Sequence, residues 1–332
     1  MPPANQPEKT CKKHHLGGMM PRGGAGRTGR GALGAARGAA GRDVAGEWLE
    51  AGVGPVEART CLGSSGWSSA FRYEAGGGRR FFVKTSRQGG AEDMFGGEAL
   101  GLQSMAAAEG GLVVPEVIHT GSDGAGGAFI IMEHLEFAPG GPDQGELGRR
   151  LGQMHLADPA VSEAAAGRFG FPVDNTIGGT PQPNGWADNW VEFFWERRLA
   201  HQLQLAGDEK LSRLGESLQG RLPSFFEGVD VRPCILHGDL WSGNIAAAGP
   251  EGAPAVFDPA SYFGHSEAEF GMSWCAGFSG AFWEAYHELV PKAPGFDERR
   301  DLYLLYHYLN HLNLFGAGYY GQCETILRRY AR

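Results

Sequence analysis

The stretch CILHGDLWSGNIA, residues 234–246, begins on a short apolar run and then carries a His, an Asp and an Asn in a segment interrupted by glycines. His237, Asp239 and Asn244 reproduce the spacing H-x-D-x-x-x-x-N, which is typical of a kinase catalytic loop. In that pattern the Asp handles the proton of a substrate hydroxyl and the Asn offers an amide oxygen to a metal ion, while we expect His237 to brace the loop. A turn that caps a strand would use the same residue types, so the rest of the chain has to decide between the two interpretations.

Other parts of a phosphoryl-transfer site stand elsewhere in the chain, in the order that such a site requires. The segment AVFDPASYF places Asp258 after a second short apolar run, and Mg2+ prefers oxygen ligands, so Asn244 and Asp258 form a candidate pair of metal ligands. Lys84 ends the predicted strand RRFFVK, and Glu98 lies on a predicted helix from which it could pair with Lys84 and direct it toward phosphates. Taken alone, Asp258 is typical of a turn cap and Lys84 of a solvated side chain. Together with Asp239 they favour a kinase-like phosphotransferase.

The candidate phosphate loop is LGSSGWSSAF, residues 62–71. Its small residues allow backbone N–H groups to approach an anion closely; they are Gly63, Ser64, Ser65 and Gly66. The segment lies between two predicted strands and is followed by neither GK[ST] nor a helix, so it is not a Walker loop. A plain glycine-containing β-turn is the alternative interpretation.

The pattern of apolar residues divides the chain into a β-rich part and a helical part. Residues 43–135 predict a small lobe of strands with a helix over 91–107 and a shorter one near its start, whereas residues 136–332 are dominated by helical periodicity. One predicted helix, over 186–206, places its large apolar residues on one broad face: Trp186, Trp190, Phe193, Phe194 and Leu199. Another ends at Gly316. The fold class expected is α+β, a two-lobed nucleotide-binding enzyme with a small β-rich N-terminal lobe and a larger helical C-terminal lobe.

The formal charge of −9 conceals an asymmetry between the first 42 residues and the remainder. Residues 1–42 carry eight Lys or Arg and one acid, so the remainder holds 21 basic and 37 acidic residues. Such an acidic body is a poor match for nucleic acid, and there is no apolar run of about 18 residues that would predict a membrane span. We therefore expect neither nucleic acid nor membrane as a partner.

Residues 1–42 are rich in Gly, Ala and Arg without apolar periodicity, so they cannot bury enough surface to fold. Two interpretations stay open, a plastid or mitochondrial transit peptide and a disordered extension of no defined role. The five cysteines are widely spaced and contain no CxxC pair, which favours a reducing compartment. We expect an intracellular protein, either cytoplasmic or organellar.

At these motifs the chain resembles the fructosamine kinase, or ketosamine-3-kinase, family, which has the two-lobed protein-kinase-like fold and is related to aminoglycoside phosphotransferases and choline kinases. The resemblance runs from about residue 55 to the C-terminus, and its most specific parts are HGDLWSGN at 237–244 and DPASYFGHSE at 258–267. It implies ATP-dependent phosphorylation of the 3-hydroxyl of a ketosamine, carried by a protein or by a small amine. Subsequent loss of that phosphate would free the amine, which amounts to deglycation and protein repair.

The resemblance also implies a role for each matching residue. Asp239 would be the catalytic base, Asn244 and Asp258 the ligands of magnesium, and Lys84 with Glu98 the pair that positions the phosphates of ATP. These assignments agree with the roles that the spacing suggested.

The remaining implied roles concern adenine, the sugar and redox control. Glu133, His134 and Leu135 would form the hinge that holds adenine through backbone groups, and Trp241 would face the sugar–amine adduct, since an indole offers a flat apolar surface; core packing is the alternative for Trp241. Some family members carry a Cys inside the nucleotide loop, but here Gly66 stands at that position. We therefore do not expect redox regulation through this loop.

Two other functions compete with a ketosamine kinase. A kinase of the same fold could act on another small hydroxyl compound, such as an aminoglycoside or a free sugar. An inactive nucleotide-binding scaffold is disfavoured because the Lys, the Asn and both Asp residues are all present. A pure binding module would rest only on the basic N-terminus.

Overall fold

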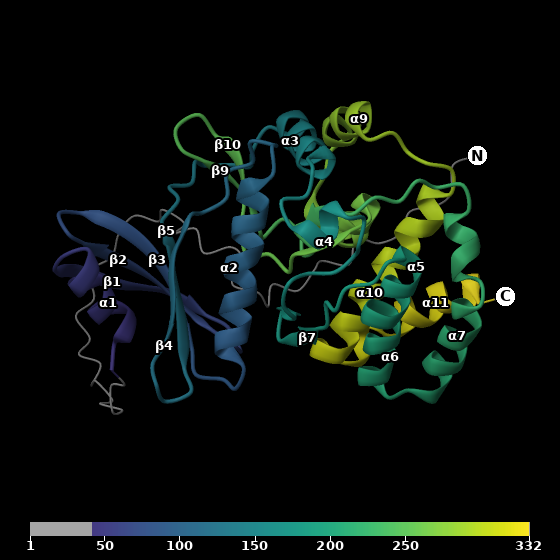
Figure 1. The fold of residues 1–332 in the computed structure, drawn as a ribbon, viewed down its shortest axis with the longest axis horizontal. Helices are drawn as coiled ribbons and strands as arrows, with labels where there is room; N and C mark the ends of the chain where they lie inside the picture. Colours follow the sequence, from purple (N-terminus) through teal and green to yellow (C-terminus); the bar gives the residue numbers. More distant parts are fainter. Residues whose placement is uncertain (1–41, 332) are drawn as a thin grey trace, which may run out of the picture.

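The computed structural model describes residues 42–331, which form two lobes (Figure 1). The N-terminal lobe is built on a five-stranded antiparallel sheet of order β1-β2-β3-β5-β4. Its strands are β1 Val56–Ser64, β2 Ser69–Ala75, β3 Arg79–Ser86, β4 Val117–Ser122 and β5 Ala128–Glu133. Two helices accompany the sheet, α1 Val44–Gly52 and α2 Ala91–Ala107; the predicted bounds of the second, 91–107, are confirmed.

Strand β5 separates the two apolar cores of the molecule. Its residues 128–132 are all buried, because each face of the strand is covered by a helix. Phe129 and Ile131 join the small cluster under α1, whereas Ile130 and Met132 join the main core with α2, since successive side chains of a strand point to opposite faces. The continuous apolar run AFIIM is the sequence signature of such a doubly covered strand.

The C-terminal lobe is mostly helical and begins after the chain leaves β5 (Figure 1). Its helices are α3 Gln144–Leu156, α4 Ser162–Ala165, α5 Trp190–Phe194, α6 Ala200–Ala206, α7 Glu209–Gln219, α8 Ser273–Ala276, α9 Gly280–Leu289, α10 Phe296–Phe315 and α11 Tyr320–Tyr330. Short antiparallel pairs lie among them: β6 Asn175–Ile177 with β7 Thr180–Gln182, β8 Cys234–Leu236 with β11 Tyr262–Gly264, and β9 Ile245–Ala248 with β10 Ala253–Val256. No helix within residues 42–331 is both long enough and apolar enough to cross a membrane.

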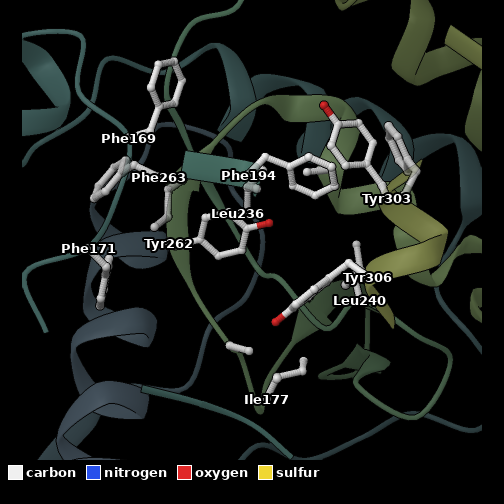
Figure 2. Close-up of a cluster of buried hydrophobic side chains, with 14 of the residues drawn as sticks. Phe169, Phe171, Ile177, Phe194, Leu236, Leu240, Tyr262, Phe263, Tyr303 and Tyr306 are labelled. Carbon is white, nitrogen blue, oxygen red and sulfur yellow. The ribbon is translucent and has the colours of Figure 1, made fainter. Parts of the chain in front are cut away.

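The core of the C-terminal lobe holds residues before and within the polar motif (Figure 2). Leu236 precedes the motif and Leu240 lies inside it, and both are fully buried in this core. Tyr262 and Phe263, on the strand that pairs with β8, are buried beside them. The apolar residues around the motif thus fix its position in the lobe.

A buried ion pair anchors the short helix that follows β11. Glu267 lies in the 3-10 helix Ser266–Met272, and its carboxylate accepts two hydrogen bonds of 2.7 Å from the guanidinium of Arg299 on α10. Arg299 is fully buried and also donates to the carbonyl of Pro294. Bidentate pairing of this kind fixes orientation as well as charge, so the helix is held firmly against α10.

The helix predicted over 186–206 is shorter than expected. It begins only at Trp190, because the side chain of Asn189 caps it by accepting the N–H of Glu192 at 3.1 Å. The prediction that Trp186 shares its apolar face is therefore wrong. The chain then forms a π-helical turn over Trp195–Leu199 before α6. The predicted end of α10 at Gly316 is confirmed.

Two glycines let α2 approach the C-terminal lobe closely. A Cβ at Gly97 would lie 2.6 Å from the Cβ of Asn175, and a Cβ at Gly101 would lie 2.9 Å from the Oγ of Ser261. A Cβ at Gly96, one residue earlier, would meet open space. The packing of α2 thus depends on the absence of side chains at two positions of one face.

We expect Gly97→Ala to lower the free energy of unfolding by about 1–3 kcal/mol, because the added methyl group overpacks the contact with Asn175. The matched control, Gly96→Ala, should raise it by about 0.5–1 kcal/mol, since Ala is the better helix former and nothing opposes its methyl group. Urea unfolding of both variants measures the two effects. Equal changes in the two variants would contradict the close approach of α2.

Candidate active site

His237 braces the loop that contains the polar motif, as predicted. Its Nε2 donates to the carbonyl of Phe257 at 2.9 Å, and its Nδ1 accepts the backbone N–H of Asp239 at 3.2 Å. Burial lowers the pKa of His237, which keeps the ring neutral and suits one donor and one acceptor nitrogen. The imidazole therefore ties this loop to the segment that leads into Asp258.

Glu269 holds the same loop from the opposite side and was missed from the sequence. Its buried carboxylate accepts the backbone N–H of His237 at 2.7 Å and that of Gly238 at 2.9 Å, and it lies 3.4 Å from Nε2 of His155. Burial alone would raise the pKa of Glu269, but its contacts with His155 and His237 outweigh burial and lower it. Gly238 has a φ of 79°, and a Cβ there would overlap the carbonyl of Ala260, so only glycine fits.

Asp239, Asn244 and Asp258 lie together at the end of this loop. The amide nitrogen of Asn244 donates to the carbonyl of Asp239 at 2.9 Å, to its carboxylate at 3.4 Å and to the carbonyl of Asp258 at 3.3 Å. Burial, followed by the charges of Asp258 and Glu269, raises the pKa of Asp239 from its ordinary 3.8 to about 7. Such a carboxyl group exchanges its proton near neutral pH, which is the property required of a general base.

The ammonium group of Lys84 links the two lobes, because it pairs with one carboxylate from each lobe. Its Nζ lies 2.7 Å from Oε1 of Glu98 on α2 and 2.6 Å from Oδ1 of Asp258 in the C-terminal lobe. Burial alone would lower the pKa of Lys84, but the two carboxylates outweigh it and raise the pKa above its usual range. Asp258 has a φ of 59°, and within residues 42–331 it is the only residue other than glycine with a positive φ. Backbone strain of this kind is typical of functional sites.

One cavity brings these side chains together. Its walls include Lys84, Glu98, Asp239, Asn244 and Asp258, all of which the sequence singled out. The remaining wall residues come from the β1–β2 turn, from α2, from the β6 region and from the segment after Asp258: Trp67, Ser68, Met94, Phe95, Asn175, Thr176, Gly178, Pro259 and Ala260. The cavity lies between the lobes and combines one ammonium group with three carboxyl groups.

The donor set fits a hard cation that is shared with phosphate. Asn244 uses its amide nitrogen within the protein, which leaves its amide oxygen for a ligand, and Asp258 offers a carboxylate beside it. No group of three or more His, Cys, Asp or Glu side chains in residues 42–331 forms a metal site by itself. Mg2+ commonly takes one or two protein ligands and completes its shell with phosphate oxygens and water, so these two residues suffice.

The predicted phosphate loop differs from the expectation. Gly63 and Ser64 belong to strand β1, where they pair with Ala70 and Ser69, so they are not part of the turn. The turn runs from Ser65 to Ser68, and Gly66 lies within it. The reason is a bulge between Cys61 and Gly63 that lets the pairing continue farther than the glycines suggested.

The predicted hinge lies where the chain passes from one lobe to the other. Glu133 ends β5, and its N–H donates to the carbonyl of Glu116 at 2.8 Å; His134 and Leu135 follow it. Two residues beyond Leu135, Phe137 stacks on Phe257 with ring centroids 5.3 Å apart. None of the three predicted hinge residues is among those that line the cavity around Asp239.

Trp241 lies inside the motif loop and is 8% exposed. Its ring packs over Gly243, where any Cβ would overlap the indole. The backbone N–H of Trp241 donates to the carbonyl of Asp239 at 3.1 Å. The tryptophan that lines the cavity is Trp67, which was not among the predicted site residues.

A buried amide network that the sequence did not reveal holds the β6–β7 hairpin at the cavity. Asn175 donates to the carbonyl of Ser261 at 2.8 Å, and Gln182 donates to the carbonyl of Ala260 at 3.1 Å. Gln182 also donates to the side chain of Asn175 at 2.8 Å. The hairpin is thereby tied to the segment after Asp258, and Thr176 is placed in the cavity wall.

Curated proteins with similar sequences are sugar–amine kinases by name. The chain is 47% identical over 300 residues to the chloroplastic protein-ribulosamine 3-kinase of Oryza sativa subsp. indica, a match that covers 89% of this chain and 85% of the rice protein. It is 36% identical over 306 residues to the ketosamine-3-kinase of Mus musculus, with 85% of this chain and 98% of the mouse protein covered.

Solved structures agree with these sequence matches. A Thermobifida fusca protein solved as a candidate fructosamine-3-kinase superposes with a TM-score of 0.74 at 30% identity, over 85% of this chain and 96% of that one. A thermostable mutant of an aminoglycoside phosphotransferase shares the fold, with a TM-score of 0.58 at 18% identity over 86% and 98% of the two chains. The family model of fructosamine kinase matches residues 53–332. The chain therefore belongs to the fructosamine kinase family and has its two-lobed, kinase-like α+β fold.

Proposed function

We propose that this kinase transfers the γ-phosphoryl group of ATP to the 3-hydroxyl of a ketosamine. The observation that carries the proposal is the shared cavity, in which the carboxyl group of Asp239 lies with Lys84 and Asp258. The names of the rice and mouse relatives, a ribulosamine 3-kinase and a ketosamine-3-kinase, support the choice of acceptor. The acceptor is a ketosamine on a protein or on a small amine.

Asp239 acts as the general base in this proposal. The acceptor hydroxyl attacks the γ-phosphorus, the bond to the bridging oxygen breaks, ADP leaves, and the hydroxyl proton passes to the Asp239 carboxylate. The pKa of Asp239, raised to about 7, lets this carboxylate take a proton more readily than an ordinary aspartate would. Glu269 and His237 contribute by fixing the loop that aims the carboxylate.

The groups around Asp239 hold the nucleotide. Lys84, aimed by Glu98, binds phosphate oxygens, and Asn244 with Asp258 would hold magnesium (Mg2+). Bound magnesium would neutralise the charge that develops on the phosphates.

Backbone groups near the cavity complete the nucleotide site in this proposal. The N–H of Gly66 approaches the phosphates from the turn that Gly63, Ser64 and Ser65 lead into, and the hinge of Glu133, His134 and Leu135 takes adenine. The hinge residues lie at the end of β5, where the chain crosses between the lobes, and this position supports their assignment to adenine.

The sugar side of the acceptor is assigned to Trp241, two residues beyond Asp239. A flat indole beside the reacting hydroxyl suits a sugar ring. Once the 3-phosphate is in place, enolisation of the ketosamine toward its first carbon makes that phosphate an allylic leaving group. Its loss frees the amine, so a single phosphoryl transfer leads to deglycation.

The extension of residues 1–42 lies outside the described residues except for Arg42. The rice and Arabidopsis thaliana relatives are named as chloroplastic, which supports a role of this basic extension in organelle import. We expect residues 1–42 fused to a fluorescent protein to direct it to an organelle, whereas the fluorescent protein alone stays in the cytosol. Cytosolic fluorescence from the fusion would rule out the targeting role and leave the second interpretation.

The proposed substrate predicts a specific product. With ATP and Mg2+, the protein is expected to phosphorylate lysine that carries a ribulose or fructose adduct, and NMR of the product should place the phosphate on the third carbon. The panel includes an aminoglycoside, a free sugar and a protein that carries the same adducts. Turnover of the aminoglycoside or free sugar alone would overturn the choice of ketosamine.

Two variants sharpen this assay. Trp241→Ala should raise the KM for the ketosamine by roughly tenfold with a smaller effect on the KM for ATP, because it removes the proposed surface for the sugar. Trp48→Ala is a matched control, since Trp48 is a partly buried tryptophan of α1 that stacks on His119 away from the cavity. An equal KM shift in both variants would argue against a sugar contact at Trp241.

The position of Asp239 predicts a pH-dependent reaction. Asp239→Asn should lower kcat by about 10²- to 10⁴-fold, the usual contribution of a general base, while ATP binding measured by calorimetry is retained. In the wild type, kcat/KM should rise with pH and level off above about 7, because the carboxyl group must lose its proton to act as a base. A pH profile that stays flat from 5 to 9 would exclude this role.

Stability provides an independent check on the same residue. Since folding raises the pKa of Asp239, the folded state holds this proton more tightly than the unfolded chain, and the carboxyl group costs stability as pH rises from about 4 to about 7. Asp239→Asn should therefore melt at a higher temperature than the wild type at pH 8, with a smaller difference at pH 5.

A further inference from the structure

Trp67 connects the β1–β2 turn, residues 65–68, of one lobe to the β6–β7 hairpin of the other. The six-membered ring of its indole lies against Gly179 in the β6–β7 turn, where a Cβ would be 3.2 Å from Cε3 and 3.6 Å from Cζ3. The same point is 3.8 Å from a methyl carbon of Leu314 on α10. The indole therefore lies close to the C-terminal lobe although its backbone belongs to the N-terminal sheet.

Hydrogen bonds fix the backbone from which the indole projects. The Oγ of Ser65 accepts the N–H of Trp67 at 3.2 Å and the N–H of Ser68 at 3.1 Å, and the Oγ of Ser86 donates to the carbonyl of Trp67 at 2.6 Å. The side chain of Gln88 donates to the carbonyl of Gly66. Because the turn is tied to the end of β3, the position of the indole is built into the sheet.

The same indole lines the cavity that holds Lys84, Asp239 and Asp258. Thr176 and Gly178, on the hairpin that Trp67 contacts, line the same cavity. The contact of Trp67 with Gly179 thus joins the two lobes beside residues that line this cavity.

We propose that Trp67 is a positioning residue which closes the catalytic cavity where the β1–β2 turn meets the β6–β7 hairpin and keeps water from the γ-phosphate. The proposal deepens the proposed function and rests on it, since it requires phosphoryl transfer in this cavity. Water competes with the sugar hydroxyl as acceptor. Exclusion of bulk water by an apolar wall prevents this side reaction.

Both reactions follow the same bond changes. The bond between the γ-phosphorus and the bridging oxygen breaks, ADP keeps the electron pair, and a new P–O bond forms to the oxygen of the sugar hydroxyl or of water. The proton from that oxygen goes to the carboxylate of Asp239. The products are ADP with either the sugar phosphate or inorganic phosphate, so the two outcomes can be measured separately.

The test compares ADP release with and without a ketosamine acceptor. Trp67→Ala should raise acceptor-free ADP release by roughly tenfold and should raise the KM for the ketosamine, because water enters and the acceptor loses a wall. In the presence of acceptor, this variant should form more ADP than phosphorylated ketosamine, whereas the wild type forms equal amounts. Trp67→Phe, which keeps an aromatic cover, should restore most of the coupling.

Gly179→Val displaces the indole from the other side while Trp67 stays in place, and it should raise acceptor-free ADP release in the same direction. Trp48→Ala is the control, with unchanged acceptor-free ADP release. If Trp67→Ala melts near the wild-type temperature and releases ADP at the wild-type rate without acceptor, the proposal is overturned. Failure of the wild type to phosphorylate any ketosamine would overturn the substrate assignment instead, and the acceptor-free rates would still report on Trp67.

Discussion

The buried carboxylate of Glu269 is the constraint on which the geometry of the site depends. It accepts two successive backbone N–H groups, of His237 and Gly238, and so fixes the direction in which Asp239 leaves the loop. The negative charge of Glu269 also contributes to the raised pKa of Asp239. One buried carboxylate therefore fixes the position of another and adds to the effect that burial and Asp258 have on its pKa, and Arg299 holds the helix of Glu269 in place through Glu267.

The two lobes meet through the close backbone packing of α2 and through the ion pairs of Lys84. Gly97 and Gly101 bring α2 close to the segments around Asn175 and Ser261. The same helix carries Glu98, which shares Lys84 with Asp258. A displacement of α2 would therefore change the charge arrangement in the cavity as well as the packing of the lobes.

Much of the fold and the grouping of the polar residues could be predicted, because both rest on local spacing. H-x-D-x-x-x-x-N placed Asp239 and Asn244 on one loop, and the order of Lys84, Glu98 and Asp258 matched a known arrangement, which the shared cavity agrees with. Glu269 could not be found this way, since an acid that binds backbone groups about thirty residues earlier leaves no local pattern. The start of the helix at Trp190 is marked by a local signal, the capping residue Asn189, but the apolar periodicity begins earlier and predicted a longer helix.

The charges in the cavity set a condition on what enters it. Lys84 is the one cation among the described residues of the cavity wall. Its ammonium group already donates hydrogen bonds to the carboxylates of Glu98 and Asp258, and Asp239 adds a third acidic group to the wall. A polyanion that approached alone would meet net repulsion at close range, in surroundings where water screens little. The cavity is thus electrostatically suited to an anion that brings its own cation rather than to a bare anion. The carboxylates of the protein would then orient that cation.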